Sequence, residues 1–482
     1  MVKRVYSLLL LLLFFSFTNY IHPQKTSIKT SLDSLLKSDI LESTTISIDI
    51  FNLNENKVVY QKNNKLLLTP ASNMKLLTSI AGILYLGADY QFETSLYYHG
   101  QIENDTLVGD LYVVGGCDPD FSLNDLQQFV NAVKSSGIKF IKGKLFGDVS
   151  FKDDVYWGSG WMWDDAPYSD APYLSALNIN DNMVTVTIQP SVQGQTAYAS
   201  VYPSTAYVSL INECKTSSAL GLNNFYATRD FKNHSNVIYI GGNIPDRRDL
   251  DSSSTNIRLS VLNPEKYFLT LFREELARNG IIIESEPELF FLPYDAIHLA
   301  TVKRSYEEVM INLNKISDNL SAEMTIYALG NKYHGKPGTA YNGLKMLNSL
   351  ILMCGMKPLK YSIADGSGVS RYNLVSTELL LELLKYLYKE NAVAFNYLYN
   401  SLPIGGVDGT LSKRMIGTSA EKNIRAKTGT LRGVSSLSGY AWAKNGSLLA
   451  FSIIIHNFTN SVDDMRNLQD EICRIMTSYD LN

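Results

Sequence analysis

The stretch Thr69–Leu86, TPASNMKLLTSIAGILYL, decides the fold. Thr69 can serve as an N-cap and Pro70 as the first helical residue, so a helix is predicted to begin here. Ser72 and Lys75 are three residues apart and therefore share one face of its first turn. The helix also has an apolar face, formed by Leu76, Leu77, Ile80, Leu84 and Leu86.

The Ser-x-x-Lys pattern is weak by itself, because most copies of it are solvated surface. Only the copy at Ser72 is predicted to lie at a capped helix start, where partial positive charge favours an alkoxide and a developing oxyanion. Apolar neighbours can desolvate Lys75 and lower its pKa toward that of a base. We therefore predict Ser72 as a nucleophile and Lys75 as its base. The chain contains four copies, Ser34/Lys37, Ser72/Lys75, Ser136/Lys139 and Ser419/Lys422.

Two further motifs follow in a fixed order. Ser317-Asp318-Asn319 precedes a predicted helix start, and Lys427-Thr428-Gly429 precedes a C-terminal hairpin. Ser-x-x-Lys, Ser-Asp-Asn and Lys-Thr-Gly together are the signature of class A β-lactamases and penicillin-binding proteins. Three motifs in this order are far more specific than any one of them.

Each motif residue has a predicted role in attack on an amide. Ser317 can relay a proton to the leaving amine, and Asn319 can bind the substrate amide or orient Lys75. Lys427 and Thr428 form a site for a substrate carboxylate. Gly429 allows close backbone approach, so that the Ser72 and Thr430 N–H groups can form an oxyanion hole.

The two ends of the chain combine strands and helices. Thr45–Phe51 and Val58–Tyr60 read as one hairpin. Leu437–Trp442 and Leu448–Ile455 read as a second, with Asn445-Gly446 in its turn. An amphipathic helix follows, with Met465, Leu468, Ile472 and Ile475 on one face. We expect both ends to form one α/β domain.

The middle of the chain has a different pattern. Leu107–Val149 and Met183–Ile244 consist of short apolar runs between turn residues, which predicts strands. Asn263–Gly280 reads as a helix with a glycine stop. The middle is therefore predicted to be a folded, β-rich insertion, and a chain of this length is expected to form two or three domains.

The N-terminus predicts export. Lys3 and Arg4 precede the apolar run Leu8–Phe17, which is typical of a secretory signal. The run is short for a helix that must cross about 30 Å of hydrocarbon, so a cleaved signal is favoured over an anchor. We assign residues 1–22 to it, leave the cleavage site open, and expect no membrane span in the mature chain.

Composition excludes several other functions. The net charge is −4 with no long basic run, so nucleic-acid binding has no electrostatic basis. The six histidines include no metal-ligand spacing, and we predict neither metal nor cofactor. Export permits disulfides, but buried free thiols are equally compatible with the scattered cysteines Cys117, Cys214, Cys354 and Cys473.

From about residue 40 to its C-terminus, the chain resembles the low-molecular-mass penicillin-binding proteins that are D-alanyl-D-alanine carboxypeptidases with a large insertion. Besides the three motifs, the resemblance rests on the segments Gly115–Pro119, Trp163–Asp165 with Ser175–Leu177, Asp365–Arg371, and Leu402–Pro403 with Gly406–Leu411. It implies a transpeptidase-like core, an antiparallel sheet with helices, interrupted by nested β-rich domains. The corresponding ranges are 25–87 and 293–482 for the core, 88–185 and 257–292 for the inserted domain, and 186–256 for a nested domain.

The resemblance also implies a function. The expected enzyme is a periplasmic serine DD-peptidase that cleaves the D-Ala–D-Ala amide of peptidoglycan stem peptides and is acylated by penicillin. Asp165 is expected to approach the substrate side chain, although a capped turn is an equal alternative. Cleavage of D-Ala–diaminopimelate cross-links uses the same chemistry and stays open, as does the oligomeric state.

Two alternative functions agree less well with the sequence. About 245 residues separate Ser72 from Ser317, too many for a compact β-lactamase, and no water-activating group for deacylation is identifiable. An inactive peptidoglycan-binding scaffold is the other alternative, and the intact motifs argue against it.

Overall fold

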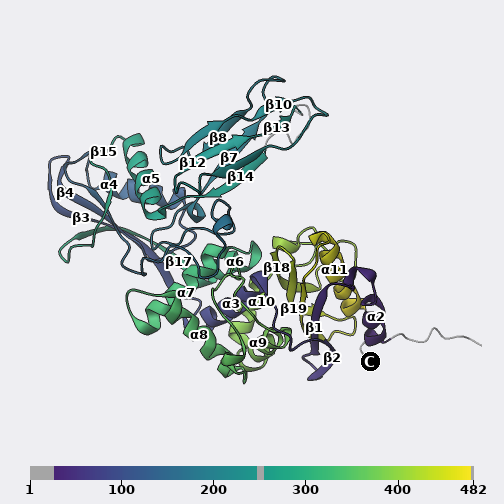
Figure 1. Ribbon diagram of the computed structural model, residues 1–482. Coiled ribbons are helices and arrows are strands. Elements are labelled where there is room, and N and C mark those ends of the chain that lie inside the picture. The colour runs from purple at the N-terminus through teal and green to yellow at the C-terminus, as the bar shows by residue number, and fades with distance from the viewer. Residues whose placement is uncertain (1–26, 247–254, 479–482) are drawn as a thin grey trace, which may run out of the picture.

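The computed structural model describes residues 27–246 and 255–478. The predicted signal segment, residues 1–22, lies outside this part of the chain. A five-stranded antiparallel sheet brings the two ends of the chain together, as predicted (Figure 1). Its order is β18 (Ile424–Leu431), β19 (Val434–Trp442), β20 (Leu448–His456), β1 (Thr45–Asn52) and β2 (Lys57–Lys62). Both predicted hairpins are confirmed, as β1–β2 and β19–β20.

Helices cover both faces of this sheet, and the side chains of strand β1 are therefore buried on both sides. On one face, α2 (Ile28–Leu35) and α11 (Val462–Ser478) share an apolar cluster with the sheet, which confirms the predicted C-terminal helix. The other face belongs to a larger cluster in which α3 (Met74–Tyr85) lies at the centre. The helices around it are α6 (Tyr306–Lys315), α7 (Asn319–His334), α8 (Ala340–Met353), α9 (Thr377–Glu390) and α10 (Ala392–Ser401).

Between α3 and α6 the chain builds a second, largely β-structured part with its own apolar cluster. Figure 1 shows it projecting away from the five-stranded sheet. One sheet contains β3 (Gln91–Glu103), β4 (Thr106–Val114), β5 (Phe140–Ile141), β6 (Leu145–Asp148), β15 (Ile282–Ile283), β16 (Glu288–Leu289) and β17 (Ile297–Ser305). Smaller sheets contain β7 (Met183–Gln189), β8 (Tyr198–Tyr202), β9 (Ser209–Asn212), β10 (Lys215–Ser217), β11 (Tyr226–Arg229), β12 (Val237–Gly241), β13 (Asn243–Pro245) and β14 (Thr255–Ser260).

Two helices accompany these strands. The predicted helix near Asn263–Gly280 is α5 (Pro264–Arg278). The prediction of strand and turn for Leu107–Val149 is wrong in part, because that stretch contains α4 (Leu123–Ser135). Ser122 and Asp125 form a capping box at its start, a signal that the sequence contained. The exact domain boundaries stay a prediction.

The start of the α3 segment also differs from the prediction. Thr69 is not an N-cap: a 3₁₀ turn, Ala71–Asn73, precedes α3, and no side chain caps either element. Ala71 has φ 49°, in the left-handed region. The turn packs on β18 and β19, where the Ser436 hydroxyl donates to the Pro70 carbonyl over 2.7 Å. Tertiary contacts therefore replace the expected cap, and Ser72 lies just before the first α-helical turn.

Within residues 27–246 and 255–478, no helix combines the length and hydrophobicity that crossing a bilayer requires. All four cysteines are unpaired, and Cys117, Cys214 and Cys473 are buried.

Candidate active site

Lys75 lies directly beside the hydroxyl of Ser72. Its Nζ donates to Ser72 Oγ over 3.1 Å and to the Ser367 carbonyl over 2.7 Å. It also donates to Oδ1 of Asn319 at the start of α7. Lys75 points from α3 toward the 3₁₀ turn, so the predicted pair is in contact although Ser72 is outside the α-helix.

Burial prepares Lys75 to act as a base. Its side chain has no exposed surface. Loss of hydration disfavours the ammonium form and lowers the pKa of Lys75 to about 8, even though nearby carboxylates act in the opposite direction. A substantial neutral fraction is therefore present at mildly alkaline pH, as the apolar neighbours predicted.

The Ser-Asp-Asn motif forms the turn into α7. Asp318 is the N-cap and accepts a hydrogen bond from the Ser321 N–H over 2.5 Å, which confirms the predicted helix start. Ser317 has φ 67° in this turn. Asn319 holds Lys75 through its oxygen and donates through Nδ2 to the Asp170 carbonyl over 2.6 Å. Of its two predicted roles, the contacts support the orientation of Lys75.

The Lys-Thr-Gly motif lies within β18, at the edge of the five-stranded sheet. Lys427 Nζ donates to Ser317 Oγ over 2.8 Å and to the Thr428 carbonyl over 2.9 Å. The three motifs therefore meet at one place. Lys427 has no exposed surface, and burial, with a smaller contribution from Lys75, holds its pKa well below the ordinary lysine value.

Gly429 provides clearance beside the nucleophile. A Cβ at this position would lie 2.3 Å from Ser436 Oγ and 2.9 Å from the backbone nitrogen of Ser72. Any larger residue would therefore push against the turn that carries Ser72, which agrees with the predicted close approach.

A cleft of about 1120 Å³ opens above these residues. Ser72, Ser317 and Asn319 line it, whereas the buried ammonium groups of Lys75 and Lys427 lie beneath its surface. Thr428, Gly429 and Thr430 from β18, and Asp165, Asp170 and Arg371 from loops, also line it.

Asp165 caps a turn, as one of the two interpretations of the sequence expected, and its role toward a substrate stays a prediction. Its carboxylate accepts the Met162 N–H over 3.0 Å and so caps the short turn Trp163–Asp165. It also borders the cleft that contains Ser72. Partial burial raises its pKa, while the nearby Arg371 guanidinium has an opposing, smaller effect.

Two buried carboxylates that were not predicted as site residues, Glu323 and Asp365, lie next to the site. Glu323 lies four residues after Asn319 on α7, and this spacing on the same helix face was an available signal. Asp365 begins the segment Asp365–Arg371, whose sequence supports the family resemblance but does not indicate a contact with the site.

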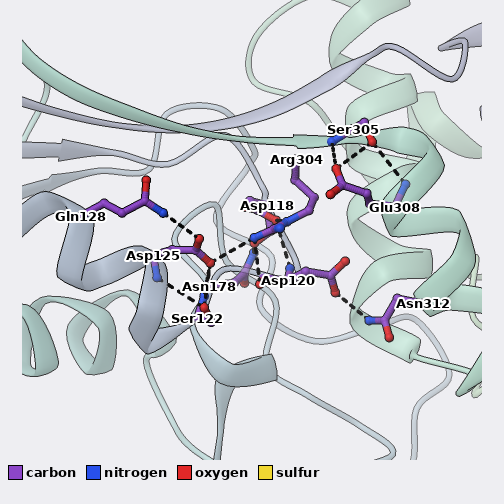
Figure 2. Close-up of polar contacts among 10 residues, drawn as sticks. All are labelled: Asp118, Asp120, Ser122, Asp125, Gln128, Asn178, Arg304, Ser305, Glu308 and Asn312. Atoms are coloured by element: carbon purple, nitrogen blue, oxygen red, sulfur yellow. Dashed lines mark hydrogen bonds and ion pairs between the residues drawn. The ribbon is translucent and has the colours of Figure 1, made fainter.

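A second polar cluster joins the insertion to the helix that leads into Ser317 (Figure 2). Arg304 donates to Asp125 over 3.0 Å and lies 3.8 Å from Asp118. Asp120 accepts a hydrogen bond of 2.6 Å from Asn312 on α6, as Figure 2 shows. Burial raises the pKa of Asp118 to about 7 and that of Asp120 to about 8. The segment Gly115–Pro119 therefore lies where the insertion contacts the core.

No group of three or more His, Cys, Asp or Glu side chains suited to a metal occurs in the described ranges. The site consists of serine, lysine and asparagine side chains with backbone groups, which suits acyl transfer through a covalent serine intermediate.

Comparison with known proteins gives a consistent result. The model of the D-Ala-D-Ala carboxypeptidase 3 (S13) family matches residues 28–479. The chain is 30% identical over 445 residues to a D-alanyl-D-alanine carboxypeptidase of an Actinomadura species, covering 89% of this chain and 81% of that protein. It is 28% identical over 435 residues to the D-alanyl-D-alanine carboxypeptidase DacB of Haemophilus influenzae, covering 88% of each.

The fold has a close counterpart among solved structures. The crystal structure of penicillin binding protein 4 (dacB) from Haemophilus influenzae matches with a TM-score of 0.79 and 26% identity, covering 92% of this chain and 97% of that one. The match confirms the penicillin-binding type of fold expected from the motifs. The chain therefore belongs to the D-Ala-D-Ala carboxypeptidase 3 (S13) family and is a low-molecular-mass penicillin-binding protein.

Proposed function

We propose that this chain is a serine DD-peptidase that cleaves the terminal D-Ala–D-Ala amide of peptidoglycan stem peptides through an acyl-enzyme on Ser72. The observation that carries the proposal is the contact of 3.1 Å between Ser72 Oγ and the desolvated Nζ of Lys75 at the cleft. Neutral Lys75 removes the hydroxyl proton while Oγ attacks the carbonyl carbon. The proton then passes to the leaving amine, by way of Ser317, as the C–N bond breaks. Water hydrolyses the resulting ester.

The oxyanion is assigned to the N–H groups of Ser72 and Thr430. Residues Leu431 and Val434 pair across a two-residue turn, and hydrogen-bonding direction alternates along an antiparallel strand. This alternation directs the Thr430 N–H away from β19, on the side of the strand that borders the cleft. The clearance at Gly429 supports the same assignment.

We assign the substrate carboxylate to Lys427, Thr428 and Thr430. The two threonines line the cleft, and Lys427 supplies charge from beneath them. An anion bound there favours the ammonium form of Lys427. Binding of the substrate carboxylate would therefore restore the positive charge that burial of Lys427 suppresses.

Lys427→Ala is expected to lower kcat/KM by about 10- to 100-fold for a stem peptide with a free terminal carboxylate, because a charge-assisted contact is lost. An amidated peptide should lose less, since only the support of Ser317 changes. Steady-state kinetics on both peptides measures the difference. Thr428→Val, which keeps the ammonium group, is the matched control for the hydroxyl contact. Equal losses on the two peptides would contradict the carboxylate site.

Asp165 is proposed to pair with the remote amino group of diaminopimelate in the stem peptide. Asp165→Asn keeps an oxygen for the Met162 N–H, so the turn should persist. We expect kcat/KM for diaminopimelate peptides to fall about tenfold, with penicillin acylation nearly unchanged.

Two controls separate recognition from structure at this position. Acetylating the substrate amino group should reproduce the defect in wild type and add little to the variant. Asp164→Asn changes the exposed neighbouring carboxylate and should have little effect. Equal losses on peptide and penicillin would identify Asp165 as structural.

The proposed partners and location follow from this chemistry. We infer an exported enzyme of the periplasm that binds peptidoglycan and is acylated by β-lactams. A related structure of penicillin binding protein 4 from Haemophilus influenzae is described as a complex with a β-lactam. Digestion of purified muropeptides followed by product identification tests the function: free D-alanine is the expected product, and absence of cleavage would overturn it. Cleaved cross-links in the same digest would add endopeptidase activity.

A further inference from the structure

Lys75 is held by a short loop that comes from a distant part of the sequence. The loop residues Gly366 and Ser367 present their carbonyl groups to α3: Thr78 Oγ1 donates to Gly366 O over 2.6 Å, and Lys75 Nζ donates to Ser367 O over 2.7 Å. The position of the lysine therefore depends on where these two peptide groups lie.

Glu323 holds the N–H groups of the same two residues, and the Ser367 N–H shares its peptide group with the Gly366 carbonyl. Its Oε1 accepts the Ser367 N–H over 2.8 Å and the Gly366 N–H over 3.1 Å. The side chain is buried, at 2% exposure, and approaches from α7. Close packing fixes the arrangement, because a Cβ on Gly366 would lie 2.5 Å from Cγ1 of Ile326 on that helix.

Asp365 holds the following part of the loop and also accepts the Ser367 hydroxyl, so the Ser367 carbonyl lies between a residue held by Glu323 and a peptide N–H held by Asp365. It accepts hydrogen bonds from the N–H groups of Gly368 and Ser370 and from the side chains of Asn373 and Trp161. The N–H groups of Gly366 and Ser367 both donate to Glu323.

We propose that Glu323 is a positioning residue for the general base: its carboxyl group fixes the backbone of residues 366 and 367, whose carbonyl groups hold Thr78 and Lys75, and it sets the pH at which Lys75 accepts the Ser72 proton. The proposal rests on the function proposed for Ser72 and Lys75. Glu323 contacts neither the nucleophile nor the cleft, and it acts through the loop and through its charge.

Charge is the second means by which Glu323 acts. The charged groups that face Lys75 are Asp318 and Glu323 on the α7 segment, Asp365 and Asp170 on loops, and Lys427 on β18. Burial, with a further contribution from Asp365, raises the pKa of Glu323 to about 8, so Glu323 and Lys75 titrate in the same range. The anionic form of Glu323 favours the ammonium form of Lys75.

Glu323→Gln and Glu323→Ala separate the two effects. Gln keeps an acceptor for both N–H groups but has no charge. We expect its maximal acylation rate to stay within about threefold of wild type, with the rising limb of the pH–rate profile shifted about half a unit or more toward acid, because the neutral lysine is easier to form. Ala removes the acceptor and should lower acylation about tenfold or more at every pH.

The measurement is the rate of acylation by a fluorescent penicillin between pH 5.5 and pH 10, together with the melting temperature of each variant. Glu265→Gln is the matched control. Glu265 is also 2% exposed, but it lies on α5 in the insertion and interacts with Lys152 rather than Lys75. The Glu265→Gln substitution should leave the pH–rate profile of acylation unchanged.

A Glu323→Gln profile that superimposes on wild type would overturn the proposal, even if the Ala variant failed to fold. So would a folded Ala variant with the wild-type rate. Lys75→Arg distinguishes this failure from that of the proposed function: if Lys75→Arg is inactive while both Glu323 variants behave as wild type, only the role of Glu323 is lost.

Discussion

Ser72→Ala is expected to abolish both muropeptide hydrolysis and covalent labelling by penicillin. The substitution removes the only atom to which the acyl group is proposed to bond, while the fold should persist, because Ser72 is only half-buried and its side chain fills little space. The residual rate should approach that of the uncatalysed reaction apart from any contribution of binding and the oxyanion hole. Labelling with fluorescent penicillin and a muropeptide digest measure the two losses.

The other Ser-x-x-Lys copies supply matched controls. Ser136 donates its hydroxyl to the Ala132 carbonyl at the end of α4, and Ser419 contacts Thr477 on α11. Ser34 lies within α2. Alanine at each of these three positions should leave labelling intact. Mass spectrometry of the intact acyl-enzyme gives a direct test, because an adduct on any residue but Ser72 would contradict the assignment.

The parts of the fold that the sequence predicted depend on local patterns. The Asn445-Gly446 turn and its apolar flanks predicted β19–β20, and spacings of three and four predicted α11. The α4 helix was missed because its few apolar residues were read as strand, although Ser122 and Asp125 marked its start. The cap expected at Thr69 was wrong because the contact that shapes this turn comes from Ser436, far along the chain.

The residues of the site also divide into those with a local sequence signal and those that depend on contacts between distant parts of the chain. Motif residues could be predicted because each has a characteristic neighbour in sequence. Ser367 could not, because its importance arises from a contact with Lys75, which is 292 residues away, and Glu323 had only its spacing from Asn319 as a signal. The burial of Lys427 beneath the cleft was also not apparent from its motif, since a lysine on an edge strand usually reaches solvent.

Lys75→Arg tests the base. Arginine keeps the positive charge and can still donate to Ser367 and Asn319, but it stays protonated throughout the accessible pH range. We expect acylation to fall by about 10²-fold or more, the usual effect of losing a general base. The rate constant for acylation by a fluorescent penicillin is the measurement, and the melting temperature shows whether the larger side chain is tolerated.

The pH dependence makes this prediction sharper. Since the pKa of Lys75 is lowered to about 8, the neutral base form accumulates as pH rises through that value. Wild-type acylation should therefore increase from pH 6 to pH 9 and level off above it, whereas the residual rate of Lys75→Arg should lack this limb. The Lys427→Ala variant serves as the control: Lys75 and its contact with Ser72 remain, so the rising limb should persist. A Lys75→Arg enzyme that kept near-normal acylation and the same rising limb would assign the base to another group, and Ser317 with a different partner would then be the first residue to test.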